Sequence, residues 1–263
     1  MITFSTCFYL LKSKFDPRVY VEWANNLISI VNNFNLVIYT DENSLKYINT
    51  RENHKIKVIL KPMEQFYNYK YSEQWIQNHN KNPILNKLVD WKVNMLWSEK
   101  VWFVNETIKN KYFDTELYGW CDIGYFRNRP NDLHTKMLKN WPNSNVITHP
   151  NKIYYACVNN NINEMNYLYK IVISKNKAGL PQVEIPANQV SIAGGFFILH
   201  RDNIDWWTNT YNTKLNLYFD NNYLVKDDQM ILLDCIFSNP DRFFLCKENN
   251  KYDNWFMFQR ILS

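Results

Sequence analysis

The chain has few glycines, no paired cysteines and no long apolar run. Glycine occupies only 5 of the 263 positions, so Gly124 and the adjacent Gly194 and Gly195 stand out as places where the backbone needs room. The 5 cysteines are odd in number, widely spaced and without a Cys-x-x-Cys pair. This pattern argues against a disulfide framework or a zinc site and favours reduced core residues in an intracellular protein.

The sequence also lacks the features that mark export, membrane insertion or nucleic-acid binding. No apolar run approaches the length that crosses a bilayer, and the N-terminus has neither a basic segment nor a small-residue cleavage site. The net charge of +5 is spread along the chain without a basic cluster. We therefore expect a cytoplasmic protein with no transmembrane segment and no nucleic-acid partner, whose mildly basic surface suits phosphate-bearing small molecules or an anionic membrane face.

Aromatic residues, in contrast, are abundant. They make up 17% of the chain and include 10 tryptophans. Most of them are expected in the core, because a hydrophobic fraction of 46% over this length supports one sizeable core. A few could form platforms for sugar rings, whose C–H faces pack on aromatic faces.

The apolar pattern alternates between strand-like and helix-like segments, and no linker divides the chain. Strands are expected at residues 3–11, 36–39, 55–60, 117–121, 145–148, 153–158, 192–199 and 242–246, and helices at 17–31, 84–108, 162–174, 202–211 and 226–237. A short helix is expected to begin at Ser44, with Ser44 as its N-cap. This order predicts a single α/β domain whose mainly parallel central sheet is flanked by helices. We expect the last third to add a smaller second sheet.

The most informative segment is residues 117–126, in which an apolar run leads to a single carboxylate, Asp122. Gly124 follows and helps the backbone to turn. In an open α/β sheet, ligands bind beyond the carboxyl ends of the strands, so Asp122 lies where a site is expected. A divalent cation that carries a diphosphate would neutralise the charge of the Asp122 carboxylate. The simpler alternatives are that Asp122 caps the next turn or pairs with Arg127 or Arg129.

Two further pairs precede apolar segments. Gly194 and Gly195 precede a strand and would let a ligand approach the backbone closely, the alternative being a β-bulge or tight packing. Asp227 and Asp228 precede a helical run. One of these is expected to be the N-cap, while the other could aim a carboxylate into a cleft as a base or as an acceptor for sugar hydroxyls.

The order of these motifs resembles that of nucleotide-sugar glycosyltransferases of the GT-A fold, and more narrowly the HtrL/WlaTC family of glycosyltransferase-like proteins. The family pattern of a strand ending in Trp-x-Asp-x-Gly is similar to residues 120–124. The segment 193–200, followed by Asp205-Trp206-Trp207 and then by Asp228-Gln229, is similar to acceptor-side blocks of glycogenin-like transferases. The resemblance covers residues 2–258 and implies a GT-A-like, Rossmann-type sandwich over residues 1–263, with a nucleotide-binding half at 1–125 and an acceptor half at 126–263.

The resemblance also implies roles for single residues. Asp122 would bind Mn²⁺ or Mg²⁺ bridging the donor diphosphate, Lys92 would contact phosphate or the donor sugar, and Asp227 and Asp228 would be catalytic. The donor-binding residues would be Thr6, Phe8, Asp41, Lys92, Asp122, Gly124, Gly194 and Gly195. For Lys92, a solvated helical lysine is the commoner outcome.

Two departures from the family pattern bear on the metal. Gly124 replaces the second carboxylate of the usual Asp-x-Asp, and the metal-binding C-terminal histidine has no counterpart in residues 251–255. Mg²⁺ held by one or two carboxylates plus phosphates is compatible with this sequence, and His200 is a candidate substitute ligand.

The sequence therefore predicts a glycosyltransferase that moves a sugar from a nucleoside diphosphate donor, with a UDP-sugar expected, to a glycan or lipid-linked acceptor. The alternative is a non-catalytic relative that binds nucleotide sugar or glycan and serves as a partner subunit. The reduced metal motif favours this alternative, whereas the glycine pair and the two adjacent aspartates disfavour it.

Overall fold

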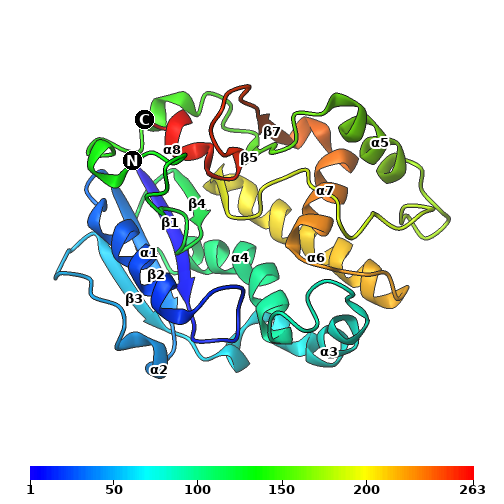
Figure 1. Ribbon diagram of the computed structural model, residues 1–263, viewed down its shortest axis with the longest axis horizontal. Coiled ribbons are helices and arrows are strands. Elements are labelled where there is room, and N and C mark those ends of the chain that lie inside the picture. Colours follow the sequence, from blue (N-terminus) through cyan, green and yellow to red (C-terminus); the bar gives the residue numbers. More distant parts are fainter.

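Figure 1 shows the computed structural model, which describes residues 1–263 as a central sheet with helices packed around it. The strands are β1 (Ile2–Phe8), β2 (Phe34–Thr40), β3 (Ile56–Leu60), β4 (Leu117–Cys121), β5 (Ile153–Ala156), β6 (Phe196–His200) and β7 (Phe243–Cys246). The helices are α1 (Pro17–Ser29), α2 (Glu42–Leu45), α3 (Ser72–Lys81), α4 (Trp91–Lys109), α5 (Ile162–Ile173), α6 (Ile204–Asp220), α7 (Asp228–Ser238) and α8 (Phe258–Ile261). The predicted α/β class is confirmed.

All strands belong to one sheet with the order β3-β2-β1-β4-β6-β5-β7. The pairs β1–β2, β1–β4, β2–β3 and β5–β7 are parallel, while β6 runs antiparallel to β4 and β5. The sheet is therefore mixed and mostly parallel. The expected second sheet is wrong, because β6 pairs with β4 along its whole length, from Cys121 opposite Phe196 to Leu117 opposite His200, and so joins the last strands to the first ones.

Several element boundaries differ from the sequence expectations because side-chain caps decide them. α4 begins at Trp91 and not at residue 84, since the Asp90 side chain accepts a hydrogen bond from the Lys92 amide. Asp41, and not Ser44, caps α2 by accepting a hydrogen bond from the Ser44 amide at 2.7 Å. The predicted strand at 145–148 is wrong: Ser144–Val146 forms a 3₁₀ turn started by Asn143. The sequence pattern did not predict α3.

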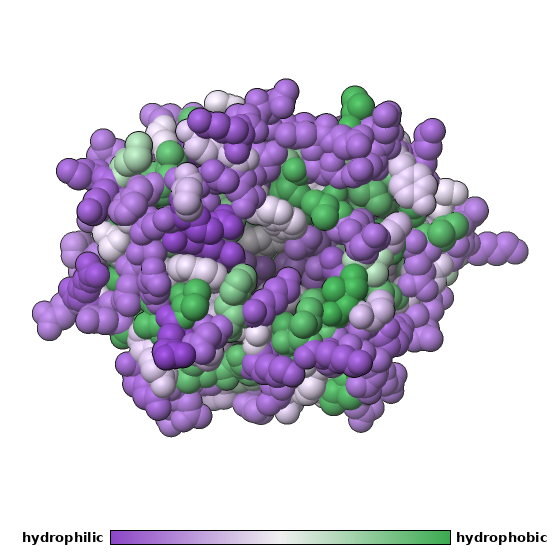
Figure 2. Space-filling view, in the orientation of Figure 1, coloured by the Kyte–Doolittle hydropathy of each residue, from purple (hydrophilic) through white to green (hydrophobic).

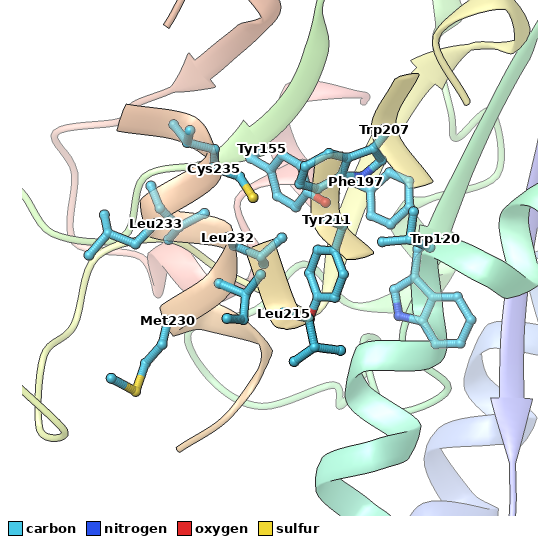
Figure 3. Packing of buried hydrophobic residues seen from close by; sticks show 14 of the residues in the cluster. Trp120, Tyr155, Phe197, Trp207, Tyr211, Leu215, Met230, Leu232, Leu233 and Cys235 are labelled. Atoms are coloured by element: carbon cyan, nitrogen blue, oxygen red, sulfur yellow. The ribbon is translucent and has the colours of Figure 1, made fainter. Parts of the chain in front are cut away.

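The central strands are buried on both faces, because successive side chains of each strand point to opposite sides of the sheet and helices cover both sides. In β1, Phe4 and Phe8 pack with residues of α1 and α8, whereas Cys7 packs on the other face with residues of α4, α6 and α7. Figure 3 shows the core on this second face, where Trp120 and Phe197 from the sheet lie near side chains from α6 and α7. This packing fixes both helix layers against one sheet.

The strand order reverses between β1 and β4: β2 and β3 lie on one side of β1, and β4 lies on its other side. The connection from β1 to β2 passes through α1 on one face, and α4 precedes β4 on the other face. Such a switch point, beyond the carboxyl ends of parallel strands, is the usual ligand-binding place in an open α/β sheet. No helix here has the length and apolar character needed to cross a membrane.

Candidate active site

A cavity of about 430 Å³ opens at the carboxyl ends of β1 and β4. Its walls come from these strand ends, from the start of β6, from one face of α4, from the N-terminus of α7 and from residues 253–256. Because β6 is antiparallel to β4, the start of β6 lies at the same edge of the sheet. Figure 2 shows this face of the molecule hollowed near its centre, with hydrophilic and hydrophobic side chains around the opening. The volume lies within the range of small-molecule sites.

Lys100 of α4 lies at the centre of this site. Its ammonium is 3.1 Å from Asp122 Oδ1 and 3.1 Å from Asp228 Oδ2, and it donates a hydrogen bond to the Gly194 carbonyl at 2.8 Å. The Lys100 side chain is only 7% exposed. One buried cation therefore joins two carboxylates that are more than a hundred residues apart in the sequence.

In addition to its ion pair with Lys100, Asp122 makes two hydrogen bonds that fix its position. The Trp120 indole Nε1 donates to Asp122 Oδ1 at 2.6 Å, and the Asp122 amide donates to the Gly195 carbonyl at 2.8 Å. Its side chain is still 39% exposed. The simpler alternatives for Asp122 are wrong, because its carboxylate pairs with Lys100 and not with Arg127 or Arg129. The arrangement leaves Oδ2 of Asp122 without a hydrogen-bond donor from the protein.

The charge states follow from burial and from these ion pairs. Burial disfavours the charged form of Lys100, but Asp122 and Asp228 outweigh burial and raise the pKa of Lys100 above its usual value. Burial raises the pKa of Asp228; Lys100 opposes this rise, while Asp227 and Asp122 add to it. Lys100 is therefore a permanent cation at neutral pH.

Gly194 and Gly195 give the two carboxylates room. A Cβ on Gly194 would lie 2.5 Å from Asp228 Oδ2, and a Cβ on Gly195 would lie 3.1 Å from Asp122 Oδ2. Real Cβ atoms do not tolerate the first of these distances. The tight-packing alternative thus holds for this pair: glycine here lets an aspartate side chain approach the backbone.

Asp227 precedes α7 at the N-cap position, but its side chain makes no capping hydrogen bond. Its Oδ2 lies 2.9 Å from the Lys226 ammonium, and its buried Oδ1 has no hydrogen-bond partner. Asp227 and Asp228 both line the cavity. The expectation that one of the two aspartates is the N-cap residue is therefore confirmed for Asp227, although its side chain does not supply the capping hydrogen bond.

The structure brings together only part of the predicted donor site. Phe8 and Gly124 line the cavity, with Gly124 packed so closely on Trp23 that a Cβ would lie 2.7 Å from its ring. Thr6, Asp41 and Lys92 do not line it. Thr6 is fully buried within β1, Asp41 caps α2, and Lys92 lies in the first turn of α4 with its ammonium 5.9 Å from the Trp91 ring centroid.

Lys100 is the site residue that the sequence reasoning missed. Val93, Leu96 and Lys100 follow one another at helical spacing and all line the cavity. A lysine on an otherwise apolar helical face was the available signal, because a solvated lysine belongs on the opposite face. Lys92 lies eight residues before Lys100, about 80° away around the helix axis, and does not line the cavity.

The residues present do not fit a resident divalent cation. No group of three or more His, Cys, Asp or Glu side chains is arranged to hold a metal ion. Asp122 and Asp228, the nearest candidate ligands, are bridged by Lys100, whose positive charge repels a second cation between them. His200 lies at the opposite end of β6, beside Asp202.

Comparisons of the sequence with models of known protein families and with curated proteins gave no match.

Proposed function

We propose that the protein is a glycosyltransferase that takes a sugar from a nucleoside diphosphate donor, a UDP-sugar in the first instance, and passes it to a glycan or lipid-linked acceptor. The observation that carries this proposal is the cluster of Lys100, Asp122 and Asp228 beside a cavity at the switch point of the sheet. A buried ion pair is weak evidence for stability, since desolvation offsets much of its attraction. A cluster of this kind beside a cavity is better explained by a ligand-binding task.

The cluster offers complementary groups to a sugar and its leaving group. Oδ2 of Asp122 and the oxygens of Asp227 and Asp228 accept hydrogen bonds from hydroxyl groups, while the Lys100 ammonium supplies a fixed positive charge. In the proposed reaction the bond between the anomeric carbon and the diphosphate oxygen breaks, and an acceptor oxygen forms the new bond. Asp227 or Asp228 would take the proton from that acceptor hydroxyl.

The cavity walls suit the other parts of such a donor. Phe8, Tyr9, Phe15, Tyr20 and Trp97 line it, together with the cations Lys14, Arg127 and Arg129. Aromatic faces pack against bases and sugar rings, and guanidinium groups bind phosphate. This mixture supports a ligand that has a ring system and an anionic group.

The test is donor-dependent sugar transfer by the wild type and by Asp122→Asn. A screen with UDP, GDP, CDP and their sugars by thermal shift identifies the donor, since a ligand at about 100 times its Kd adds about 2.7 kcal/mol to the free energy of unfolding. In Asp122→Asn the oxygen that accepts from Trp120 is kept, so the variant should fold. We expect its transfer rate to fall at least about a hundredfold, because the charge opposite Lys100 is lost.

Asp114→Asn is the matched control, because Asp114 is 90% exposed and lies before β4, at the other end of that strand. It should leave transfer unchanged. Wild-type turnover in Asp122→Asn would remove Asp122 from the mechanism.

One observation favours the alternative of a non-catalytic binding subunit. Asp122 and Asp228 are both paired with Lys100, and Asp227 is paired with Lys226, so each carboxylate of the cluster already has a cationic partner. This alternative predicts a thermal shift with a nucleotide sugar but neither transfer nor hydrolysis of the donor. Measuring release of the free nucleotide distinguishes the two functions.

A further inference from the structure

Two cations of the cavity wall have no carboxylate partner. Of the four basic residues that line the cavity, Lys100 is paired with Asp122 and Asp228, and Arg129 is paired with Asp132 and Asp253. Lys14 and Arg127 form no ion pair. Four aspartates also line the cavity, but none of them lies within ion-pair distance of Lys14 or Arg127, so these two cations lack a direct counter-charge.

Arg127 is held in one orientation by its surroundings. Its Nε donates to the Gly124 carbonyl at 2.8 Å, and its guanidinium carbon lies 4.1 Å from the Trp23 ring centroid and 4.9 Å from that of Phe256. The side chain is half-buried, and its terminal nitrogens make no hydrogen bond within the protein. Burial lowers the pKa of Arg127, and Arg129 acts in the same direction. An anion bound to the terminal nitrogens would relieve both effects.

Lys14 supplies charge from another part of the wall. It lies in the loop after β1, with its ammonium 4.9 Å from the Trp97 ring centroid of α4, whereas Arg127 follows β4. Both line the cavity together with Lys100. A ligand with two adjacent anionic groups can contact one cation with each group, whereas a single monovalent anion has only one charge to share between them.

We propose that Arg127 and Lys14, backed by Lys100, bind a diphosphate group without a divalent cation. The assignment rests on the proposed function in taking this diphosphate to be that of a nucleotide-sugar donor. Arg127 would hold one phosphate through its two terminal nitrogens, and Lys14 would neutralise the other as a point charge. Lys100 is fixed between Asp122 and Asp228, the two carboxylates that would otherwise be the candidate metal ligands.

Isothermal titration with inorganic pyrophosphate, in the presence of EDTA and then of Mn²⁺, tests the site without depending on the donor. We expect pyrophosphate to bind in EDTA, with an affinity that Mn²⁺ changes by no more than about twofold. In Arg127→Gln the affinity for pyrophosphate should fall about tenfold to a hundredfold, as for a lost charge-assisted hydrogen bond. Lys14→Gln should lose less, since Lys14 is exposed. Arg18→Gln, in which a 92% exposed arginine outside the cavity wall is replaced, is the matched control and should bind as the wild type does.

The outcomes separate this inference from the proposed function. Absence of binding in EDTA with binding restored by Mn²⁺, or unchanged affinity in a folded Arg127→Gln, overturns the inference while leaving a glycosyltransferase in place. Pyrophosphate could instead bind without metal and through Arg127 while no nucleotide sugar gives a thermal shift. That result supports the anion site and overturns the proposed function. If Arg127→Gln unfolds, Arg127→Lys replaces it: the charge is kept, so the loss of the two-nitrogen contact should still weaken binding several-fold.

Discussion

At the scale of single residues, the site depends on how closely charged atoms approach glycine. Lys100 lies between Asp122 and Asp228, and its third contact is the Gly194 carbonyl. A side chain on Gly194 would occupy the place of the Asp228 carboxylate. Desolvation of these charges offsets part of their attraction, so the cluster depends on exact geometry for its stability.

Gly194→Ala is therefore expected to push Asp228 away from Lys100. Its new Cβ would start 2.5 Å from Asp228 Oδ2, and overpacking of this kind costs about 1–3 kcal/mol of unfolding free energy. We expect donor affinity to fall as well, because the ion pair with Lys100 is distorted. Urea unfolding measures the first effect and a nucleotide titration the second.

A double variant distinguishes this steric explanation from a general weakness of the segment before β6. In the Asp228→Ala background the side chain that clashes is gone, so adding Gly194→Ala should cost less than it does in the wild type. Equal costs in the two backgrounds would contradict the clash with Asp228.

At the scale of elements, α4 connects two separate parts of the structure through neighbouring residues. Lys100 faces the cavity, while Glu99 accepts hydrogen bonds from the amides of Tyr67 and Asn68 and from the Asn68 side chain at 2.7–3.0 Å. These bonds attach the 3₁₀ segment Tyr67–Tyr71 to the helix. Glu99 is 1% exposed, so its charge is carried inside the protein.

Glu99 should make the stability depend on pH. Burial raises its pKa to about 7 from an ordinary value of 4.5, even though the hydrogen bonds from Asn68 and Tyr67 act in the opposite direction. The unfolded chain therefore loses this proton first. The contribution of Glu99 to the unfolding free energy is highest below pH 4.5 and falls by about 3 kcal/mol as the pH rises to about 7.

Urea unfolding of the wild type and of Glu99→Gln at several pH values between 5 and 8 checks this expectation. The variant cannot ionise at this position, so its stability should fall less over this window, whatever its absolute stability. Glu64→Gln, which replaces an exposed glutamate near the same segment, should keep the wild-type slope. Parallel curves for the wild type and Glu99→Gln would show that Glu99 does not titrate here.

At the scale of the whole molecule, one sheet joins the two halves of the chain. β4 of the first half pairs with β1 on one side and with β6 of the second half on the other. Each core cluster also mixes residues from both halves, as Phe4 with Phe196 and Trp120 with Phe197. Neither half can therefore bury its own apolar surface alone.

We expect residues 1–263 to unfold in a single cooperative transition. Tryptophans lie in both cores, Trp141 in one and Trp75 and Trp207 in the other, so fluorescence reports on both faces of the sheet. The fluorescence and far-ultraviolet circular dichroism curves in urea should coincide. Two separate transitions would instead indicate that residues 1–125 and 126–263 are independent folding units.

Much of the fold followed from local patterns, and less of the site did. The apolar run at 117–121 correctly placed a strand end at Asp122, and the run after Asp228 correctly placed a helix. In the structure, Lys100 lines the cavity without having been predicted, whereas the predicted site residues Thr6, Asp41 and Lys92 do not line it. These changes arise because a side chain's role depends on which face of its element meets the cavity, and the neighbouring elements decide that face.

The sequence by itself determined most of the order of strands and helices, except for α3 and the wrongly expected strand at 145–148, since hydrophobic periodicity and capping residues act over a few positions. It also determined that Asp122 follows a strand and that Asp227 and Asp228 start a helix. Only the tertiary structure decided that β6 enters the sheet antiparallel to β4, which brings Gly194 beside Asp228 and places Lys100 between the two carboxylates. Strand pairing and helix docking are non-local contacts, and the free energy that selects them comes from burying surfaces distant in the sequence.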